Sequence, residues 1–210
     1  MSMRNQIIEA ALDLFASQGF ASTTVAEIEA AAGLAAGSGG LYRHFASKRA
    51  VFAAAVDWAD EHVYAAAELD ARLLDIDRPH DALRAAGETA LVAVRKAAPF
   101  HLAVLRAGRD APIEPAQLAD RLVLRSYRQF AMWIRTFAAA GVFRRVDAAA
   151  YAATALGSIV WFHFAEVFTG TTPGAIDDDR FLDGWVDAHW TSLATAAAAS
   201  GSTPAATTSS

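Results

Sequence analysis

Apolar side chains recur at intervals of three and four residues along most of this chain, which is the spacing of one buried face of an α-helix. The first such run consists of Ile7, Ile8, Ala11, Leu14 and Phe15. No stretch of any length alternates between apolar and polar residues as a half-buried strand does. With 210 residues, the chain is long enough to bury a core in one or two domains. The sequence therefore predicts an all-α protein.

The first fifty residues divide into three short helices before a longer one begins. Gly19 is placed to end the first helix. The second begins after Thr24, because Glu27 follows it by three residues in the pattern of a capping box. This second helix stops at Gly33, and a third, short helix covers 41–45.

Longer helices are predicted for the rest of the chain. Ser47 is the expected N-cap of the first of them. The acids Asp177, Asp178 and Asp179 suit the positive end of the last helix, and a metal site on them is the weaker alternative. The low-complexity residues 199–210 predict a disordered tail. Further helices are predicted over 79–97, 99–109, 114–140, 147–169 and 179–198, which gives about nine in all.

Composition excludes several classes of protein. The chain has no cysteine, so disulfides and thiolate metal sites are excluded. Its net charge of −5 argues against a protein that is basic all over, and three cations gather at Arg43, Lys48 and Arg49. The most apolar stretch, 148–167, contains His163 and is predicted to be a buried helix, not a membrane span. Polar and acidic residues follow the N-terminus too early for a signal peptide, so we expect a cytoplasmic protein.

Two short helices, a glycine-bearing turn and a third segment with exposed polar and aromatic groups form the layout of a helix-turn-helix. In such a unit the first helix braces the pair, the second crosses the DNA backbone and the third faces the major groove. Hydroxyl groups, cations and backbone amides at helix starts bind phosphate. The layout therefore predicts binding to double-stranded DNA.

A set of residues at fixed spacing carries a more specific resemblance. These residues are Arg4, Ile7, Ile8, Ala11, Leu14, Phe15, Gly19, Phe20, Thr23, Thr24, Val25, Ile28, Ala31, Ala32 and Gly33, then Leu41, Tyr42, His44, Phe45, Ser47 and Lys48. They resemble the DNA-binding domain of the tetracycline-repressor (TetR) family. The resemblance implies a helix-turn-helix domain over 1–46 and a ligand-binding and dimerisation domain over 47–198.

By the same resemblance, the protein is a homodimeric transcriptional repressor and not an enzyme. Its implied partners are a palindromic operator in double-stranded DNA and a small effector bound within the C-terminal domain. The helices near 147–169 and 179–198 are implied to join two copies of the chain. The resemblance calls for no cofactor or metal. The alternative is a helical protein that binds small molecules and has weakened DNA binding, because residues 1–50 carry no net charge.

The chain departs from the family pattern before Tyr42. The family takes seven steps from the turn glycine to this tyrosine, whereas here Gly33 precedes Tyr42 by nine, so two residues are extra. Gly40 stands where the family has serine or threonine, and Ser38 is the expected replacement N-cap. Either the longer turn re-aims or shortens the recognition helix, or it leaves DNA docking unchanged.

The candidate site residues form two groups. The predicted DNA contacts are Thr23, Thr24, Ser38, Gly39, Gly40, Tyr42, Arg43, His44 and Lys48, with Arg43 able to read a guanine edge. The candidate effector contacts are His101, Arg106, Phe130, Trp133, Phe137, Trp161, His163 and Glu166, which suggest a mostly hydrophobic effector. The alternatives are a capping role for Thr24, a core role for the aromatic stripe, and a buried histidine or dimer contact at His163. Leu41 and Phe45 are expected to form a small core.

Overall fold

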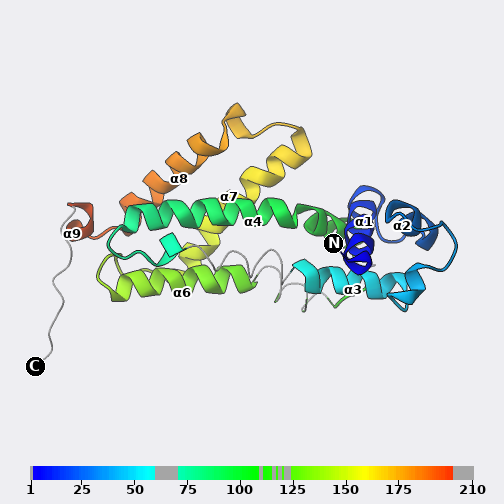
Figure 1. Ribbon diagram of the computed structural model, residues 1–210. Coiled ribbons are helices and arrows are strands. Elements are labelled where there is room, and N and C mark those ends of the chain that lie inside the picture. The colour runs from blue at the N-terminus through cyan, green and yellow to red at the C-terminus, as the bar shows by residue number, and fades with distance from the viewer. Residues whose placement is uncertain are drawn as a thin grey trace, which may run out of the picture. The chain divides into compact units, whose positions relative to one another are not determined.

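A computed structural model confirms the all-α prediction (Figure 1). It describes residues 2–59, 71–108, 111–114, 117, 120 and 124–200. The predicted tail beyond residue 200 and most of 115–123 therefore lie outside the described residues. The chain divides into two compact units: the first is Met1–Ala66 with Lys96–Val123, and the second is Ala67–Arg95 with Leu124–Ser210. The predicted domain boundary at 46/47 differs from this division and stays a prediction.

Three helices of the first unit pack around aromatic side chains. They are α1 (Met3–Gln18), α2 (Val25–Ala31) and α3 (Lys48–Ala59), drawn in blue to cyan in Figure 1. Phe15 lies with its ring centroid 5.3 Å from that of Phe20 and 5.6 Å from that of Phe52. Gly19 ends α1 with φ of 88°, as predicted. Ala50 donates its N–H to the Ser47 hydroxyl at the start of α3, which confirms that cap.

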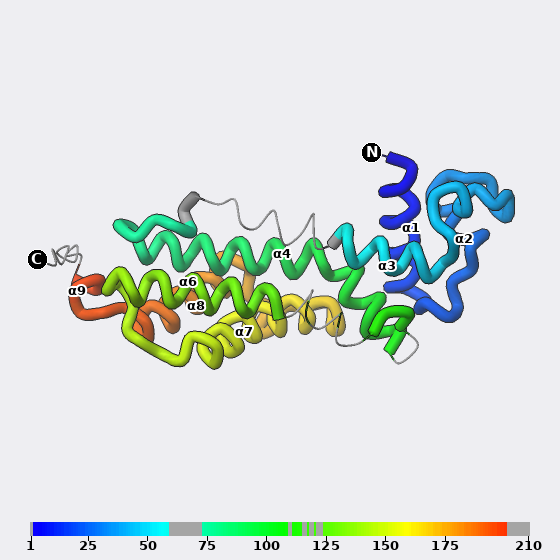
Figure 2. Tube along the Cα trace, turned by 90° about the horizontal axis from the view of Figure 1, so that it is seen from below, coloured from blue at the N-terminus to red at the C-terminus, as the bar shows by residue number. Residues whose placement is uncertain are grey.

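The second unit places α6 (Arg125–Ala139) against α7 (Ala148–Thr169), with α8 (Asp178–Leu193) completing its core (Figure 2). Asp147 caps α7 and Asp177 caps α8 through their carboxylates. The largest fully buried side chains of this core are Leu83, Ile134, Phe137, Phe143 and Ile159. The predicted helix over 147–169 is confirmed.

One helix, α4 (Pro79–Ala107), contributes residues to both units. The sequence predicts two helices that separate near Pro99, and this prediction is wrong. A proline inside a helix removes one backbone N–H and crowds the preceding turn, but it does not always end the helix. Here Ala97 and Phe100 are buried beside Pro99, and the burial offsets the missing hydrogen bond.

A glycine allows α4 to approach α8 closely. A Cβ atom at Gly87 would lie 3.0 Å from Leu182 Cδ2 and 3.1 Å from Trp185 Cε3. Glycine is a poor helix former, so its presence within α4 is explained by this contact and not by local propensity.

The last predicted helix, 179–198, is divided in the structure, so its predicted end is wrong. α8 ends at Leu193, and a short helix, α9 (Ala196–Ala199), follows. Ala194 is extended, with φ of −60° and ψ of 135°, and forms an antiparallel bridge with Phe143. Backbone hydrogen bonds to a segment distant in sequence therefore interrupt a run of helix-favouring residues.

Among the described helices, α7 alone has the length and apolarity to cross a membrane. Ala152, Leu156, Ile159 and Phe162 of this helix are buried in the core of the second unit. The prediction of a buried core helix is confirmed.

Candidate functional site

The start of α2 is fixed by the predicted capping box. The Thr24 hydroxyl accepts a hydrogen bond from the Glu27 N–H at 3.2 Å, and Glu27 Oε2 accepts from the Thr24 N–H at 2.7 Å. This backbone hydrogen bond, with the bond from the Thr24 hydroxyl, holds the pKa of Glu27 below its usual value. Thr24 is exposed and its capping role is confirmed, while contact with phosphate stays a prediction.

Thr23 is a buried polar residue in the turn between α1 and α2. Its side chain is buried, and its hydroxyl donates to the Gly19 carbonyl at 2.9 Å and accepts from Gln18 Nε2 at 3.3 Å. The structure thus gives the hydroxyl a role in the turn between α1 and α2, and a contact of Thr23 with phosphate stays a prediction.

Lys48 also turns inward. Its Nζ donates to the carbonyls of Phe20 and Thr23, each at 2.6 Å, and lies 3.4 Å from the Ala21 carbonyl oxygen. The ammonium is 4.4 Å from the centre of the Phe20 ring, and desolvation lowers the pKa of Lys48. In this arrangement Lys48 ties the start of α3 to the α1–α2 turn, so the predicted phosphate contact is not supported.

The glycine-rich turn begins with a Schellman motif at the end of α2. Gly33 has φ of 77° and donates to the Ala30 carbonyl, while Leu34 donates to the Glu29 carbonyl at 2.7 Å. Further on, Gly37 and Gly39 have φ of 72° and 74°, which side-chain-bearing residues rarely adopt.

The third helix is shorter than predicted. It is a single 3-10 turn, η1 (Leu41–Arg43), so His44 and Phe45 lie beyond its end. Gly40 stands at its N-cap position without a side-chain cap, and therefore the prediction that Ser38 caps this element is wrong. Leu41 and Phe45 are buried, which confirms their place in a small core.

The same turn presents polar groups to solvent. Tyr42 is 58% exposed, and Arg43 and His44 are exposed beside it. The guanidinium carbon of Arg4, in α1, lies 5.1 Å from the centre of the Phe45 ring, and this cation–π contact stabilises the turn. Three predicted DNA-contacting side chains are thus brought together on one short surface segment, with Gly39 and Gly40 immediately before it.

The sequence did not single out Glu29, which is fully buried in α2. Its Oε1 accepts a hydrogen bond from the Leu41 N–H at 2.9 Å. The available signal was its position, because Glu29 lies four residues after Val25 and three before Ala32, on the apolar face of α2.

The candidate effector residues are divided between the two units. His101 and Arg106 belong to the first unit, where Arg106 donates to the Ser17 carbonyl at 2.6 Å. The remaining candidates belong to the second unit. The grouping of all eight around one site stays a prediction, and Trp161 is 65% exposed on the surface of α7.

The aromatic stripe of α6 belongs to the core. Phe137 is fully buried, with its ring 4.6 Å from that of Trp133 and 5.0 Å from that of Phe143. Phe130 stacks on Trp133 at 5.4 Å, and Trp133 Nε1 donates to the Leu73 carbonyl. These contacts support the alternative that the stripe packs the protein interior.

His163 is the polar candidate that lies inside the second unit. Only 7% of it is exposed, and neither ring nitrogen has a hydrogen-bond partner within the described part of the chain. Burial lowers the pKa of His163, and the nearby Arg95 guanidinium lowers it further, against the opposing charges of Glu166 and Asp178. Glu166 pairs with Arg95 at 3.2 Å, and Arg95 also bonds Asp178, whose pKa it lowers.

A second histidine of this unit, His189, lies between Tyr151 and Trp185. The Tyr151 hydroxyl is 2.7 Å from His189 Nδ1 and 2.5 Å from the Ser192 hydroxyl, and the rings of Trp185 and His189 are 4.4 Å apart. Burial lowers the pKa of His189 and raises that of Tyr151.

Because both histidine pKa values are lowered in the folded chain, we expect stability to fall on acidification. Below about pH 6.5, His163 and His189 bind protons in the unfolded chain more readily than in the folded chain. Each histidine therefore lowers the free energy of unfolding by up to about 1.4 kcal/mol per pH unit. Urea unfolding between pH 7.5 and 5.5 measures this loss. The double substitution H163Q/H189Q should flatten the dependence and H44Q, on the exposed turn, should not. An unchanged slope in the double variant would contradict this origin.

The sequence of the N-terminal part matches a family of known proteins. Residues 7–55 match the sequence profile of bacterial regulatory proteins of the tetR family. The search of curated proteins gives no match.

Solved structures share the fold. A putative TetR-family transcriptional regulator from Mesorhizobium loti is 18% identical, with a TM-score of 0.71 over 92% of this chain and 97% of that one. The TetR-family transcriptional regulator PfmR from Thermus thermophilus is 23% identical, with a TM-score of 0.65 over 93% and 99%. AibR, crystallised with isovaleryl coenzyme A and operator DNA, is 21% identical, with a TM-score of 0.62 over 89% and 97%. At these identities the likeness shows the all-helical architecture.

Proposed function

The N-terminal part of this chain is a DNA-binding domain of the TetR family of bacterial regulatory proteins, and on this premise we propose that the protein is a homodimeric transcriptional repressor. It binds a palindromic operator and leaves it when a small effector binds the second unit. The observation that carries the proposal is the exposed group Tyr42, Arg43 and His44 on a turn anchored by buried Leu41 and Phe45. A helix-turn-helix presents side chains to the major groove in this way.

An effector acts by binding the conformation that does not fit DNA more tightly than the one that does. Within the second unit, His163 supports a place for it, because its buried imidazole offers two nitrogens that have no hydrogen-bond partner among the described residues. A mostly apolar molecule with one polar group near this ring would supply the missing hydrogen bond. AibR binds isovaleryl coenzyme A, and isovalerate, which has an apolar chain and one carboxyl group, is therefore a suitable first probe.

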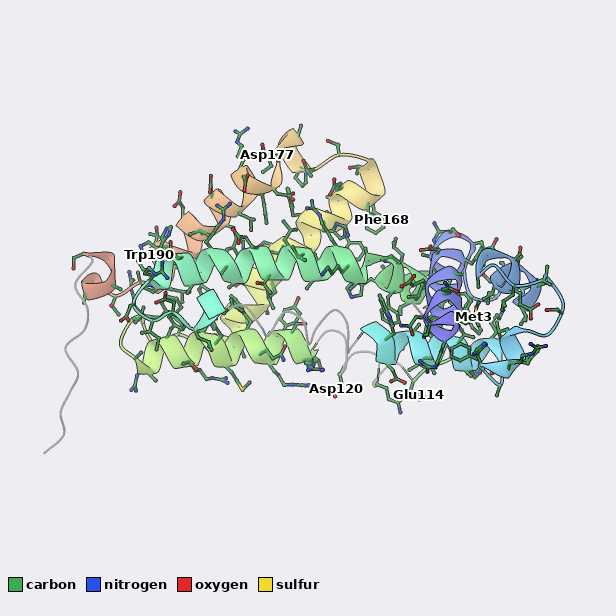
Figure 3. The ribbon with its side chains drawn as sticks, in the orientation of Figure 1. Met3, Glu114, Asp120, Phe168, Asp177 and Trp190 are labelled. Carbon is green, nitrogen blue, oxygen red and sulfur yellow. The ribbon has the colours of Figure 1, made fainter. Side chains whose placement is uncertain are left out.

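The surface of α7 supports dimerisation. Trp161 and Phe168 lie seven residues apart, so they project from the same side of the helix, and they are 65% and 61% exposed (Phe168 is labelled in Figure 3). Val167 beside them is also exposed. An apolar patch of this kind on a water-facing helix is typical of a surface that a second chain covers.

Binding of the purified protein to the DNA upstream of its own gene tests the proposal, with fluorescence anisotropy and unrelated DNA as competitor. We expect a specific complex, and R43A should weaken it by about tenfold or more, because an arginine that reads a base edge contributes about 1–3 kcal/mol. R135A removes the same charge from the exposed face of α6 and should bind like the wild type. If R43A and R135A both bound the operator as tightly as the wild type, a contact by Arg43 would be excluded. Absence of any specific complex would favour the alternative of a small-molecule-binding protein with weakened DNA binding.

A further inference from the structure

We infer that Glu29 is a positioning residue for DNA recognition, which holds both ends of the segment 34–41 that leads into Tyr42 and Arg43. Its main-chain carbonyl accepts from the Leu34 N–H at 2.7 Å, and its side-chain Oε1 accepts from the Leu41 N–H at 2.9 Å. One residue of α2 therefore fixes the first and last positions of the segment 34–41. This inference rests on the proposed function.

The short helix η1 has no side-chain cap from its own segment in the described structure. Gly40 occupies the N-cap position of η1 and has no side chain to accept a hydrogen bond, while Ser38 is exposed. Leu41 is fully buried, so its N–H is shielded from water and needs a protein acceptor. Glu29 supplies that acceptor from a neighbouring helix, in place of the local Ser or Thr cap that commonly begins a helix.

The environment of Glu29 indicates a role other than stability. The residue is fully buried, and its Oε2 has no hydrogen-bond partner among the described residues. A buried carboxylate with one unsatisfied oxygen is unfavourable for folding. The carboxylate holds the Leu41 amide in one defined position.

The glycines allow the segment to close over this carboxylate. Gly37 and Gly39 adopt left-handed conformations, and a Cβ at Gly40 would lie 3.3 Å from Leu34 Cδ1. The His44 N–H donates to the Leu41 carbonyl at 2.9 Å, so the position of Leu41 also fixes the end of η1. The segment 34–41 is therefore held by glycine conformations at its centre and by Glu29 at its ends.

A matched pair of substitutions separates the acceptor from the charge. Glu29→Gln and Glu29→Met both remove the negative charge and keep an unbranched side chain, but only glutamine retains an oxygen for the Leu41 N–H. Specific affinity is measured on the upstream fragment and non-specific affinity on unrelated DNA. Hydrogen exchange of the Leu41 amide is measured in parallel in the same full-length proteins.

We expect E29M to lose about tenfold or more in specific affinity, with unchanged non-specific affinity and faster exchange at Leu41. E29Q should remain within about threefold of the wild type in both measurements. Wild-type binding by E29M would overturn the inference. Loss of exchange protection throughout α1 and α3 in E29M would also overturn it, since Glu29 would then serve folding of the whole unit.

The two proposals can fail separately. If the wild-type protein forms no specific complex, the proposed function fails. Exchange at Leu41 still reports whether Glu29 fixes the turn, and unchanged exchange in E29M overturns the inference by itself.

Discussion

Replacement of Trp161 by glutamate is expected to convert the protein from a dimer into a monomer and to reduce operator affinity by about 100-fold or more. The proposed dimer covers an exposed stripe of α7 that includes Trp161, and a carboxylate there would be buried without a partner. Each monomer would then bind one half of a palindromic site without the gain in effective concentration that a linked second half provides.

Sedimentation velocity and fluorescence anisotropy on the same W161E sample measure both effects. M132E is the matched control, because Met132 is a similarly exposed apolar residue on α6, outside the proposed dimer surface. We expect M132E to sediment and bind DNA like the wild type. A W161E protein that still sediments as a dimer would show that two copies associate through another surface.

Replacement of Phe137 by alanine should lower the free energy of unfolding by about 3–5 kcal/mol, the range for a large aromatic removed from a packed core. Phe137 is fully buried and packs on Trp133 and Phe143, so the smaller side chain leaves a cavity that rigid neighbours cannot fill.

Urea unfolding followed by circular dichroism measures the loss in F137A, with M132A as the exposed control on the same helix. We expect M132A to change the free energy by less than about 0.5 kcal/mol. If F137A instead kept its stability and bound an effector more weakly, the aromatic stripe of α6 would line a ligand site.

Features decided by neighbours in sequence were predictable here. The capping box at Thr24 and Glu27, the Gly19 helix end and the Ser47 cap depend on residues three or four apart, and all three are confirmed. The layout of a helix-turn-helix follows from the same local signals.

Features decided by distant partners were not predictable. Lys48 meets carbonyls of residues 20–23, and Glu29 meets the Leu41 amide, only after the helices have packed. The end of α8 depends in the same way on the bridge between Ala194 and Phe143. Sequence spacing identifies which residues share a helix face, but it does not show which charged side chain turns inward.

The inward position of Lys48 has a consequence for the thermodynamics of DNA binding. Cations that neutralise phosphates release condensed counterions, and each such contact contributes about −0.9 to the slope of log K against log salt. Lys48 donates to the carbonyls of Phe20 and Thr23 in place of a phosphate, whereas Arg43 is exposed on η1. A dimer that lacks the Lys48 contact in both subunits has a slope smaller in magnitude by about 2. Its affinity for DNA would then depend less on ionic strength than the affinity of a protein whose Lys48 contacts a phosphate.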